Sequence, residues 1–204
     1  MKTTAFISQK GGVGKTTLAT ALAVAAHLDG KSAAVIDLDP QASASFWKDA
    51  RQAEEPAVTA VPPTRLGSVL DAARATGCDW AVIDAPPMAK DIAFEAARLA
   101  DFILVPTRPA VFDVMAISRT LELVAHYDKP SAVVLSLCPV RGHEVADTEA
   151  AAHELGAVVA PVRIHNRIAF SRAQQSGMTA QEFAPRSQAA EELIHLYQYV
   201  CSIL

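Results

Sequence analysis

The chain has 204 residues, of which 51% are hydrophobic and 20% are charged, so it can bury a sizeable core and is not extensively disordered. At about 150 residues per domain, this length favours a single domain over residues 1–204. The formal net charge of −4 argues against a uniformly basic nucleic-acid binder, and no apolar run approaches the ~20 residues that span a bilayer, so we expect a cytoplasmic protein.

Six continuous apolar runs predict strands that are buried on both faces of a parallel sheet. They are residues 4–7, 33–36, 81–83, 102–105, 132–135 and 158–160. Helix-like stretches alternate with them, at residues 16–28, 66–75, 92–99, 114–126 and 148–155, and a last amphipathic helix is expected over residues 187–204. This alternation predicts an α/β fold with a doubly wound, mostly parallel sheet. Residues 47–63 are expected to form a flexible surface stretch, in which residues 58–61 could add a short strand.

The segment from Gln9 to Thr17 reads QKGGVGKTT and lies between the first predicted strand and a helix. A phosphate-binding loop needs this context, because glycines let successive N–H groups face one anion and the helix N-terminus adds its positive end. We expect Lys15 to contact the outer phosphates and the Thr16 hydroxyl to bind Mg²⁺. The alternative is an ordinary glycine turn. The candidate nucleotide-binding residues are Lys10, Gly11, Gly12, Val13, Gly14, Lys15, Thr16 and Thr17.

Carboxylates end two of the predicted strands. The segment VIDLDPQ places Asp37 and Asp39 after the second apolar run, and VIDAPP places Asp84 after the third. Doubly wound folds bind their ligands at the carboxyl ends of the strands. A carboxylate such as Asp84 can hold Mg²⁺ directly or through a water molecule. Turn-forming residues at strand ends are the alternative for all three.

The loop departs from the usual pattern G-x-x-x-x-G-K-S/T, because Gln9 stands where glycine is expected. With Lys10 it resembles the deviant Walker A signature, K-G-G-x-G-K-S/T-S/T, of the ParA-type partition ATPases. The segments D-x-D-P-Q and D-x-P-P resemble further motifs of that family. The resemblance covers nearly the whole chain and implies a P-loop ATPase that uses ATP and Mg²⁺.

The resemblance also implies roles for individual residues. Lys10 would reach the phosphates of the partner subunit in an ATP-dependent sandwich homodimer, Asp39 would position the attacking water, and Asp37 would lie near the Mg²⁺. Many family members carry an Asn-Arg pair after the fifth of these strands, where Asn can read the base. This chain has Ser136 there, which offers only a hydroxyl.

The implied function is the positioning of a cargo on DNA. The dimer would bind DNA without reading its sequence and would segregate a plasmid, a chromosome or a protein assembly, activated by a ParB-like or cargo-adaptor protein. The protein would then be nucleoid-associated. Because the phosphate loop begins only nine residues into the chain, the resemblance is to the small members without an N-terminal helix-turn-helix.

The segment from Arg163 to Arg186 has four arginines and a single acid, Glu182, so it is the part of the chain where an anionic polymer would bind. The resemblance implies nonspecific DNA contacts in this late region. Ordinary intramolecular ion pairs are the alternative. The candidates are Arg163, Arg167, Arg172 and Arg186.

Three rival functions fit the sequence less well. A MinD-like membrane-associated ATPase would end in a basic amphipathic helix, but no Lys or Arg follows Arg186. An iron–sulfur reductase needs paired cysteines, whereas Cys78, Cys138 and Cys201 are far apart in sequence and are expected to be buried apolar residues. A small ligase of the dethiobiotin or cobyrinate type would need a substrate pocket built from insertions, for which 204 residues leave little room.

Overall fold

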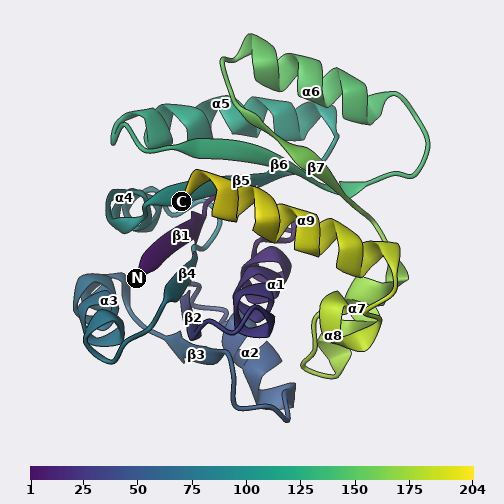
Figure 1. Cartoon of the computed structure of the whole chain (residues 1–204). Helices are drawn as coiled ribbons and strands as arrows, with labels where there is room; N and C mark the ends of the chain where they lie inside the picture. Colours follow the sequence, from purple (N-terminus) through teal and green to yellow (C-terminus); the bar gives the residue numbers. More distant parts are fainter.

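The computed structural model describes residues 1–204, apart from the side chains of residues 111, 112 and 114–116. One sheet runs through the molecule, with its strands in the order β3-β2-β4-β1-β5-β6-β7 and every neighbouring pair parallel (Figure 1). The strands are β1 (Lys2–Phe6), β2 (Ala33–Asp37), β3 (Ala57–Ala60), β4 (Trp80–Asp84), β5 (Phe102–Thr107), β6 (Ser131–Cys138) and β7 (Val159–His165).

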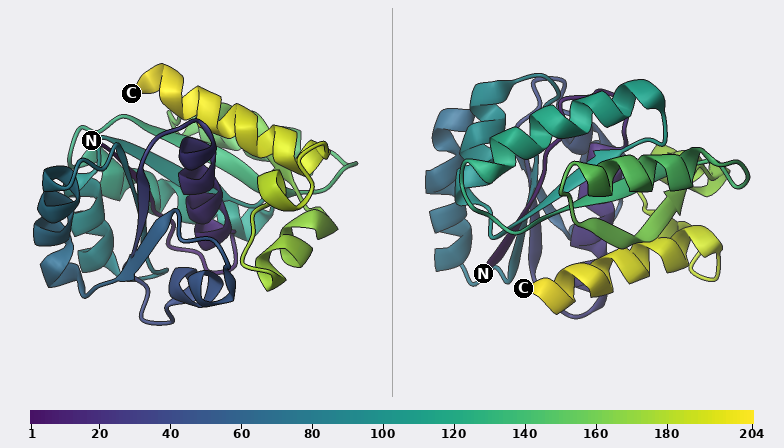
Figure 2. Two further views of the ribbon diagram at one scale, coloured as in Figure 1. Left: turned by 60° about the horizontal axis from the view of Figure 1, so that its bottom comes forward. Right: turned by 90° about the horizontal axis from the view of Figure 1, so that it is seen from above.

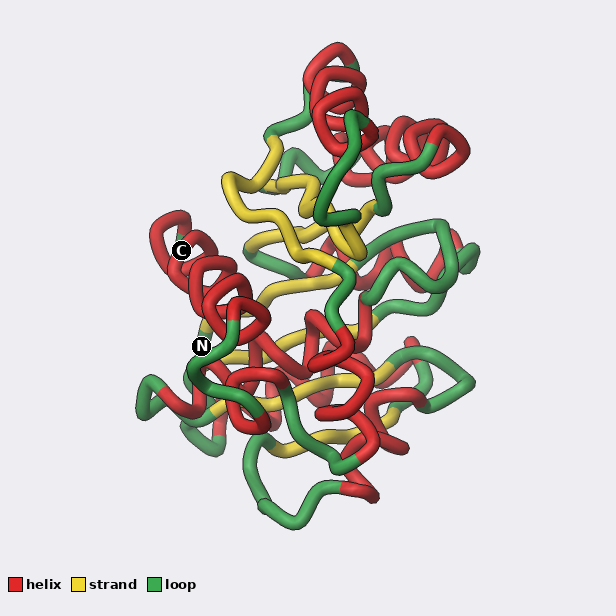
Figure 3. Tube along the Cα trace, turned by 90° about the vertical axis from the view of Figure 1, so that its right-hand side faces the viewer, coloured by secondary structure: helices red, strands yellow, loops and turns green.

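Helices cover both faces of this sheet, so the strands form the middle layer (Figure 3). On one face pack α1 (Lys15–Leu28), α2 (Ser43–Ala50), α7 (Ile168–Gln175), α8 (Ala180–Phe183) and α9 (Gln188–Ile203). On the other face pack α3 (Leu66–Ala75), which follows a short 3₁₀ turn (Pro63–Arg65), α4 (Lys90–Leu99), α5 (Val111–Ala125) and α6 (Glu144–Glu154). This arrangement confirms the predicted α/β fold with a doubly wound parallel sheet.

Two hydrophobic cores lie on the two faces, because successive strand residues point in opposite directions. On β4, Trp80 and Val82 pack under α1 and α9, whereas Ala81 and Ile83 pack under α3 and α4. All four are fully buried. Helix α1 packs against both the sheet and α9, so ten of its residues are buried, and the loop before it is held firmly in place.

The sequence placed the main strands and helices correctly, but several shorter segments differ from what was expected. The prediction of a flexible surface stretch over residues 47–63 is wrong at its start, because Trp47 lies in α2 and is only 5% exposed. The short strand left open over residues 58–61 is present as β3 and pairs with β2. Helices α2, α7 and α8 were not predicted. Of the cysteines only Cys138 is buried, since Cys78 and Cys201 are partly exposed.

The chain termini lie near each other in all views (Figure 2). Because β1 and its neighbours β4 and β5 are parallel, the loop that follows β1 lies at the carboxyl ends of the strands. At that edge the predicted motifs meet: Asp37 at the end of β2 lies directly beside Asp84 at the end of β4.

Candidate phosphate-binding site

The loop between β1 and α1 has the backbone of an anion-binding turn. Gly12 and Gly14 have φ angles of 70° and 83°, which residues with a side chain rarely adopt. A Cβ atom added at either position would meet no atom within 4 Å, so the inner side of the loop is open. Helix α1 begins at Lys15, directly after Gly14. The loop therefore presents free N–H groups and the positive end of a helix to the same space.

Lys15 brings a positive charge to the floor of the loop. Its side chain is only 7% exposed, and its Nζ donates a hydrogen bond to the backbone oxygen of Lys10 at 3.0 Å. Burial lowers the pKa of the Lys15 ammonium, while the nearby carboxylates of Asp84 and Asp39 act in the opposite direction and favour its charged form. An ammonium held in this way has few competing water contacts and is available to bind phosphate oxygens.

Thr16 and Asp84 form the part of the site that fits a divalent cation. Thr16 Oγ1 donates a hydrogen bond to Asp84 Oδ2 at 2.6 Å, and Asp84 is 1% exposed. Its other oxygen, Oδ1, is buried without a partner among the described atoms. Burial raises the pKa of this carboxyl to about 7, although the Thr16 hydrogen bond opposes the shift. A buried carboxylate oxygen with no protein donor, beside a hydroxyl, is the hard oxygen environment that Mg²⁺ prefers.

In the described part of the chain, no group of three or more His, Cys, Asp or Glu side chains could hold a metal by itself. This agrees with Mg²⁺ chemistry, because Mg²⁺ is commonly held by one or two carboxylates together with waters and substrate phosphates. Thr16 and Asp84 are therefore suited to hold Mg²⁺ when phosphate oxygens complete its shell.

Asp37, the last residue of β2, and Asp39, two residues after it, lie in different environments. Asp37 is 1% exposed, and its carboxylate accepts hydrogen bonds from the N–H groups of Asp39, Ala44 and Ser45 at 3.0, 2.9 and 3.3 Å. It thereby fixes the turn and the start of α2, and burial raises its pKa. Asp39 is only partly buried and accepts a hydrogen bond from the N–H of Gln41 at 2.9 Å. Of the two, Asp39 is the one open to a ligand.

A pocket of about 430 Å³ brings the loop and Asp39 together. Besides the predicted residues Gly11, Gly12, Gly14, Lys15, Thr16, Thr17 and Asp39, it is lined by Ser43, Phe46, Trp47, Pro87 and Gln174. The sequence analysis singled out none of the last five as site residues. Only Pro87 had a local signal, since it lies in the D-x-P-P segment, whereas the others come from the unpredicted helices α2 and α7.

Helix α7 reaches the loop through Gln174, whose Nε2 donates a hydrogen bond to Thr17 Oγ1 at 2.6 Å. A second pocket, of about 410 Å³, lies next to the first and shares Gly14, Thr17 and Gln174 with it. It extends along β6 and β7 towards Ser136 and Asn166. Two adjacent pockets therefore lie beside the first turn of α1.

The remaining loop residues, Val13 and Lys10, are held by side chains from β6 and α5. Val13 is buried, and its backbone oxygen accepts a hydrogen bond from Ser136 Oγ at 2.8 Å. Lys10 is 41% exposed and its Nζ lies 3.5 Å from Oδ1 of Asp113, which also binds Arg108 at 2.7 Å. The structure thus brings Lys10 to the edge of the site but directs its ammonium towards its own subunit.

The four candidate DNA-binding arginines divide into two pairs. Arg163 forms an ion pair with Glu149 at 2.6 Å, and Arg167 forms one with Glu192 at 2.8 Å. Arg172 and Arg186 are exposed and form no ion pair or hydrogen bond through their side chains in the described part of the chain. The intramolecular alternative therefore applies to the first pair, and the second pair is free to bind an anion.

Taken together, a parallel sheet with a glycine-rich loop, a buried lysine and a threonine–carboxylate pair at its carboxyl edge defines a P-loop nucleotide-binding protein. The family model described as the CobQ/CobB/MinD/ParA nucleotide binding domain matches residues 4–180. The chain belongs to this family. The resemblance to the ParA-type ATPases seen in the motifs is confirmed at this level.

Individual relatives agree with this assignment. Protein ParA of Rhizobium radiobacter is 28% identical over 180 residues, covering 83% of this chain and 81% of that protein. Maintenance of carboxysome distribution protein A of Halothiobacillus neapolitanus is 26% identical over 202 residues, covering 95% of this chain and 93% of that protein. The fold matches the septum site-determining protein MinD of Pyrococcus horikoshii, solved in complex with Mg-ADP, with a TM-score of 0.82 at 19% identity over 98% of this chain and 95% of that one.

One rival function considered from the sequence was a MinD-like membrane-associated ATPase. No helix in the described part of the chain combines the length and the apolar character needed to cross a bilayer. The exposed residues of α9 include Glu191 but no lysine or arginine. This helix lacks the basic face by which an amphipathic helix binds an anionic membrane surface.

Proposed function

We propose that this protein is a Mg²⁺-dependent ATPase that forms an ATP-bound sandwich homodimer, and that the dimer binds DNA nonspecifically to position or segregate a cargo. The observation that carries the proposal is the junction of the two pockets. A triphosphate in the first pocket would meet Lys15, Thr16 and Asp39, and a nucleoside attached to it would extend past Thr17 into the second.

The residues of the first pocket supply what phosphoryl transfer requires, which is positioning and stabilisation of charge. Backbone N–H groups of the loop and the Lys15 ammonium would hold the β and γ phosphates. Mg²⁺, held by Thr16 and near Asp84, neutralises developing charge when it is bound. Asp39 would orient the attacking water, because its carboxylate lines the pocket and is not enclosed by backbone donors as that of Asp37 is. Asp37 would contribute to the Mg²⁺ shell only through water.

Lys10 would complete the site of a second copy. Its ammonium is partly exposed and is held by a long contact to Asp113, so it can leave that contact at small cost. Across a dimer interface it would neutralise the charge that develops between the β and γ phosphates. This makes hydrolysis depend on dimer formation, as a nucleotide switch requires.

The named relatives support a positioning function, since one is Protein ParA and others are carboxysome distribution proteins. The cargo would therefore be a plasmid or chromosome, or a protein assembly, and a ParB-like or adaptor protein would activate hydrolysis. The exposed pair Arg172 and Arg186 would contact the phosphates of the nucleoid DNA.

The decisive experiment measures the mass of the purified protein by light scattering with ATP, with ADP and with ATP plus EDTA, together with phosphate release with and without duplex DNA. We expect a dimer only with ATP and Mg²⁺, and DNA retention only for that dimer. A monomer under all conditions would contradict the switch. Phosphate release stimulated by a small carboxylic acid, and not by DNA, would point instead to a ligase.

A further inference from the structure

The second pocket has both apolar and polar residues in its lining. It begins at Gly14 and Thr17, and apolar side chains of Leu18, Leu137 and Phe170 line it. In a nucleoside triphosphate the base lies at the end opposite to the γ phosphate. With the phosphates on the loop, the base therefore falls in this pocket, and the following inference rests on the proposed function.

Most polar side chains of the pocket are already engaged within the chain. Ser136 Oγ donates to the backbone oxygen of Val13 at 2.8 Å, and Gln174 donates to Thr17 at 2.6 Å. Ser171 Oγ donates to the backbone oxygen of Ile168 at 3.0 Å. The guanidinium of Arg167 donates to Glu192 through two of its nitrogens. Each of these side chains is therefore held in position by a contact of the fold.

Asn166 is the exception. Its backbone N–H donates to the oxygen of Cys138 at 2.9 Å, which anchors the residue at the end of β7 beside β6. The residue lines the pocket and is exposed, and its side chain has no hydrogen-bond partner among the described residues. We propose that Asn166 is the residue that selects adenine. It would read the base in place of the Asn that many family members carry where this chain has Ser136.

The chemistry of the amide supports adenine. An Asn side chain presents one acceptor and two donors, and adenine offers its N6 amino donor beside the ring acceptors N1 and N7, so the amide can pair with either edge. The corresponding N7/O6 edge of guanine has two acceptors and leaves the amide oxygen unpaired. A carboxylate at the same position would reverse the preference, because it accepts from the N1–H and N2–H donors of guanine and repels the ring nitrogens of adenine.

The test compares the affinities of ATP, GTP and inorganic tripolyphosphate, each with Mg²⁺, by titration calorimetry on the wild type and on Asn166→Ala and Asn166→Asp. Asn166→Ala should weaken ATP by about 5- to 150-fold, the range for one bidentate base contact. Tripolyphosphate, which has no base, should bind as before. Asn166→Asp should shift the ratio of GTP to ATP affinity towards GTP.

The matched control is Ser171→Ala, which lines the same pocket but whose hydroxyl is already bonded to the backbone. It should leave the ratio of ATP to GTP affinity unchanged. Asn166 would not be the selecting residue if Asn166→Ala lowered the affinities for ATP and tripolyphosphate equally, or left the ratio of ATP to GTP affinity unchanged. The ATPase proposal would still stand in either case. If the wild type bound neither ATP nor tripolyphosphate, the proposed function would fall as well.

Discussion

Lys10 and Asp113 form an ion pair inside one subunit, with Lys10 Nζ 3.5 Å from Oδ1 of a carboxylate that is 2% exposed. Arg108 binds the other oxygen of Asp113 at 2.7 Å, so this carboxylate keeps a cationic partner when the lysine leaves. Because the lysine is 41% exposed and Arg108 keeps the buried carboxylate paired, loss of the lysine contact should cost little stability. The pair is therefore a resting position from which Lys10 can reach another subunit.

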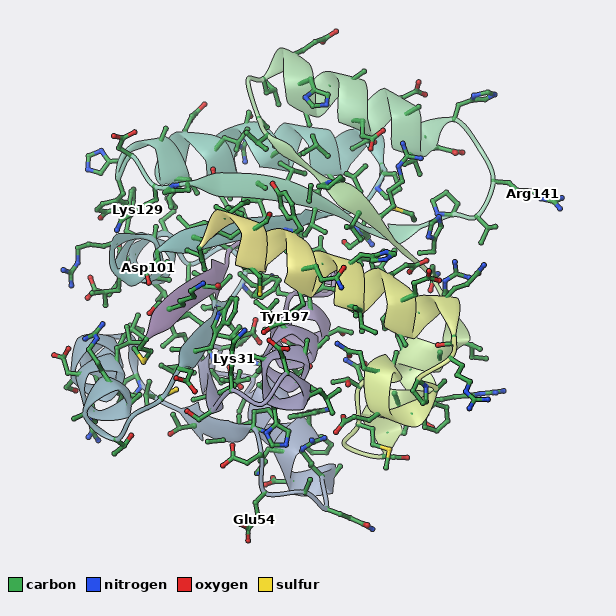
Figure 4. All side chains as sticks on the ribbon, in the orientation of Figure 1. Lys31, Glu54, Asp101, Lys129, Arg141 and Tyr197 are labelled. Atoms are coloured by element: carbon green, nitrogen blue, oxygen red, sulfur yellow. The ribbon has the colours of Figure 1, made fainter. Side chains whose placement is uncertain are left out.

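We expect Lys10→Ala to fold normally and to bind ATP with nearly wild-type affinity, because the residue acts across the interface. Dimer formation with ATP and stimulated hydrolysis should both be lost. Light scattering and calorimetry measure the two properties separately. Lys129→Ala removes a lysine at the far end of the molecule (Figure 4) and serves as the control. Normal ATP-dependent dimerisation of the Lys10 variant would contradict the cross-subunit role.

Lys15→Ala should largely abolish nucleotide binding, with a loss of about 10- to 150-fold in ATP affinity for each phosphate contact, since a hydrogen bond to a charged group is worth roughly 1.5–3 kcal/mol. The buried ammonium also bonds the backbone of Lys10, so the circular dichroism spectrum and the melting temperature of the variant should be checked first. Undiminished ATP affinity in a folded variant would remove the phosphate-loop assignment.

Asp39→Ala should separate binding from turnover. ATP would still bind through the loop and Mg²⁺, whereas hydrolysis should fall by about 100-fold or more because the water is no longer oriented. The dimer formed with ATP should consequently persist longer on size-exclusion chromatography. Asp37→Ala provides the contrast, since it removes the acceptor for Ala44 and Ser45 and should lower the melting temperature. An Asp39 variant that hydrolyses ATP at the normal rate would show that Asp39 does not position the water.

Asp84 should make the metal-free protein less stable as the pH rises. Its folded pKa is raised to about 7, against an ordinary value of 3.8, so between these values the folded state binds more protons than the unfolded one. This group's contribution to the free energy of unfolding therefore falls as pH rises through that window and stays low above pH 7.

Urea unfolding in EDTA at pH 5 and pH 8 tests this relation. Asp84→Asn retains an acceptor for Thr16 but carries no charge. At pH 8 its free energy of unfolding should exceed that of the wild type, by a few kcal/mol at most, and at pH 5 this gain should be smaller. The exposed Asp147→Asn should show no such difference between the two values. Mg²⁺-dependent ATP binding should weaken in the Asp84 variant. Equal effects of Asp84→Asn at both pH values would contradict the raised pKa.

DNA binding should depend most on Arg172 and Arg186, because their side chains are exposed and form no ion pair among the described residues. Changing either to Glu should weaken ATP-dependent retention on nonspecific duplex DNA and make the log–log salt dependence shallower by about 0.9 per lost contact. Arg163→Glu and Arg167→Glu should have smaller effects on DNA, since these arginines neutralise Glu149 and Glu192.

Lys129→Glu makes a comparable charge change at the amino end of β6, away from α7, and should leave DNA retention nearly unchanged. ATP affinity and dimerisation should be intact in all these variants. If the Arg172 and Arg186 variants bound DNA like Lys129→Glu, the DNA surface would have to lie elsewhere.

The sequence alone determined the elements whose signals are local. The apolar runs predicted the buried strands because both faces of a parallel strand are covered, and the glycines before Lys15 predicted the loop because their conformational freedom and the helix start are properties of adjacent residues. The carboxylates were found for the same reason, since Asp37 and Asp84 follow directly after strands that end at one edge.

Only the tertiary structure decided which distant residues complete the site. Strand β3 exists through its pairing with β2, and α2 begins where the carboxylate of Asp37 accepts its first N–H groups. Gln174 meets Thr17 across 157 positions of sequence, and Glu149 and Glu192 neutralise two of the four arginines. These contacts depend on how the helices pack over the sheet, and packing joins side chains whose separation in the chain leaves no periodic or compositional signal.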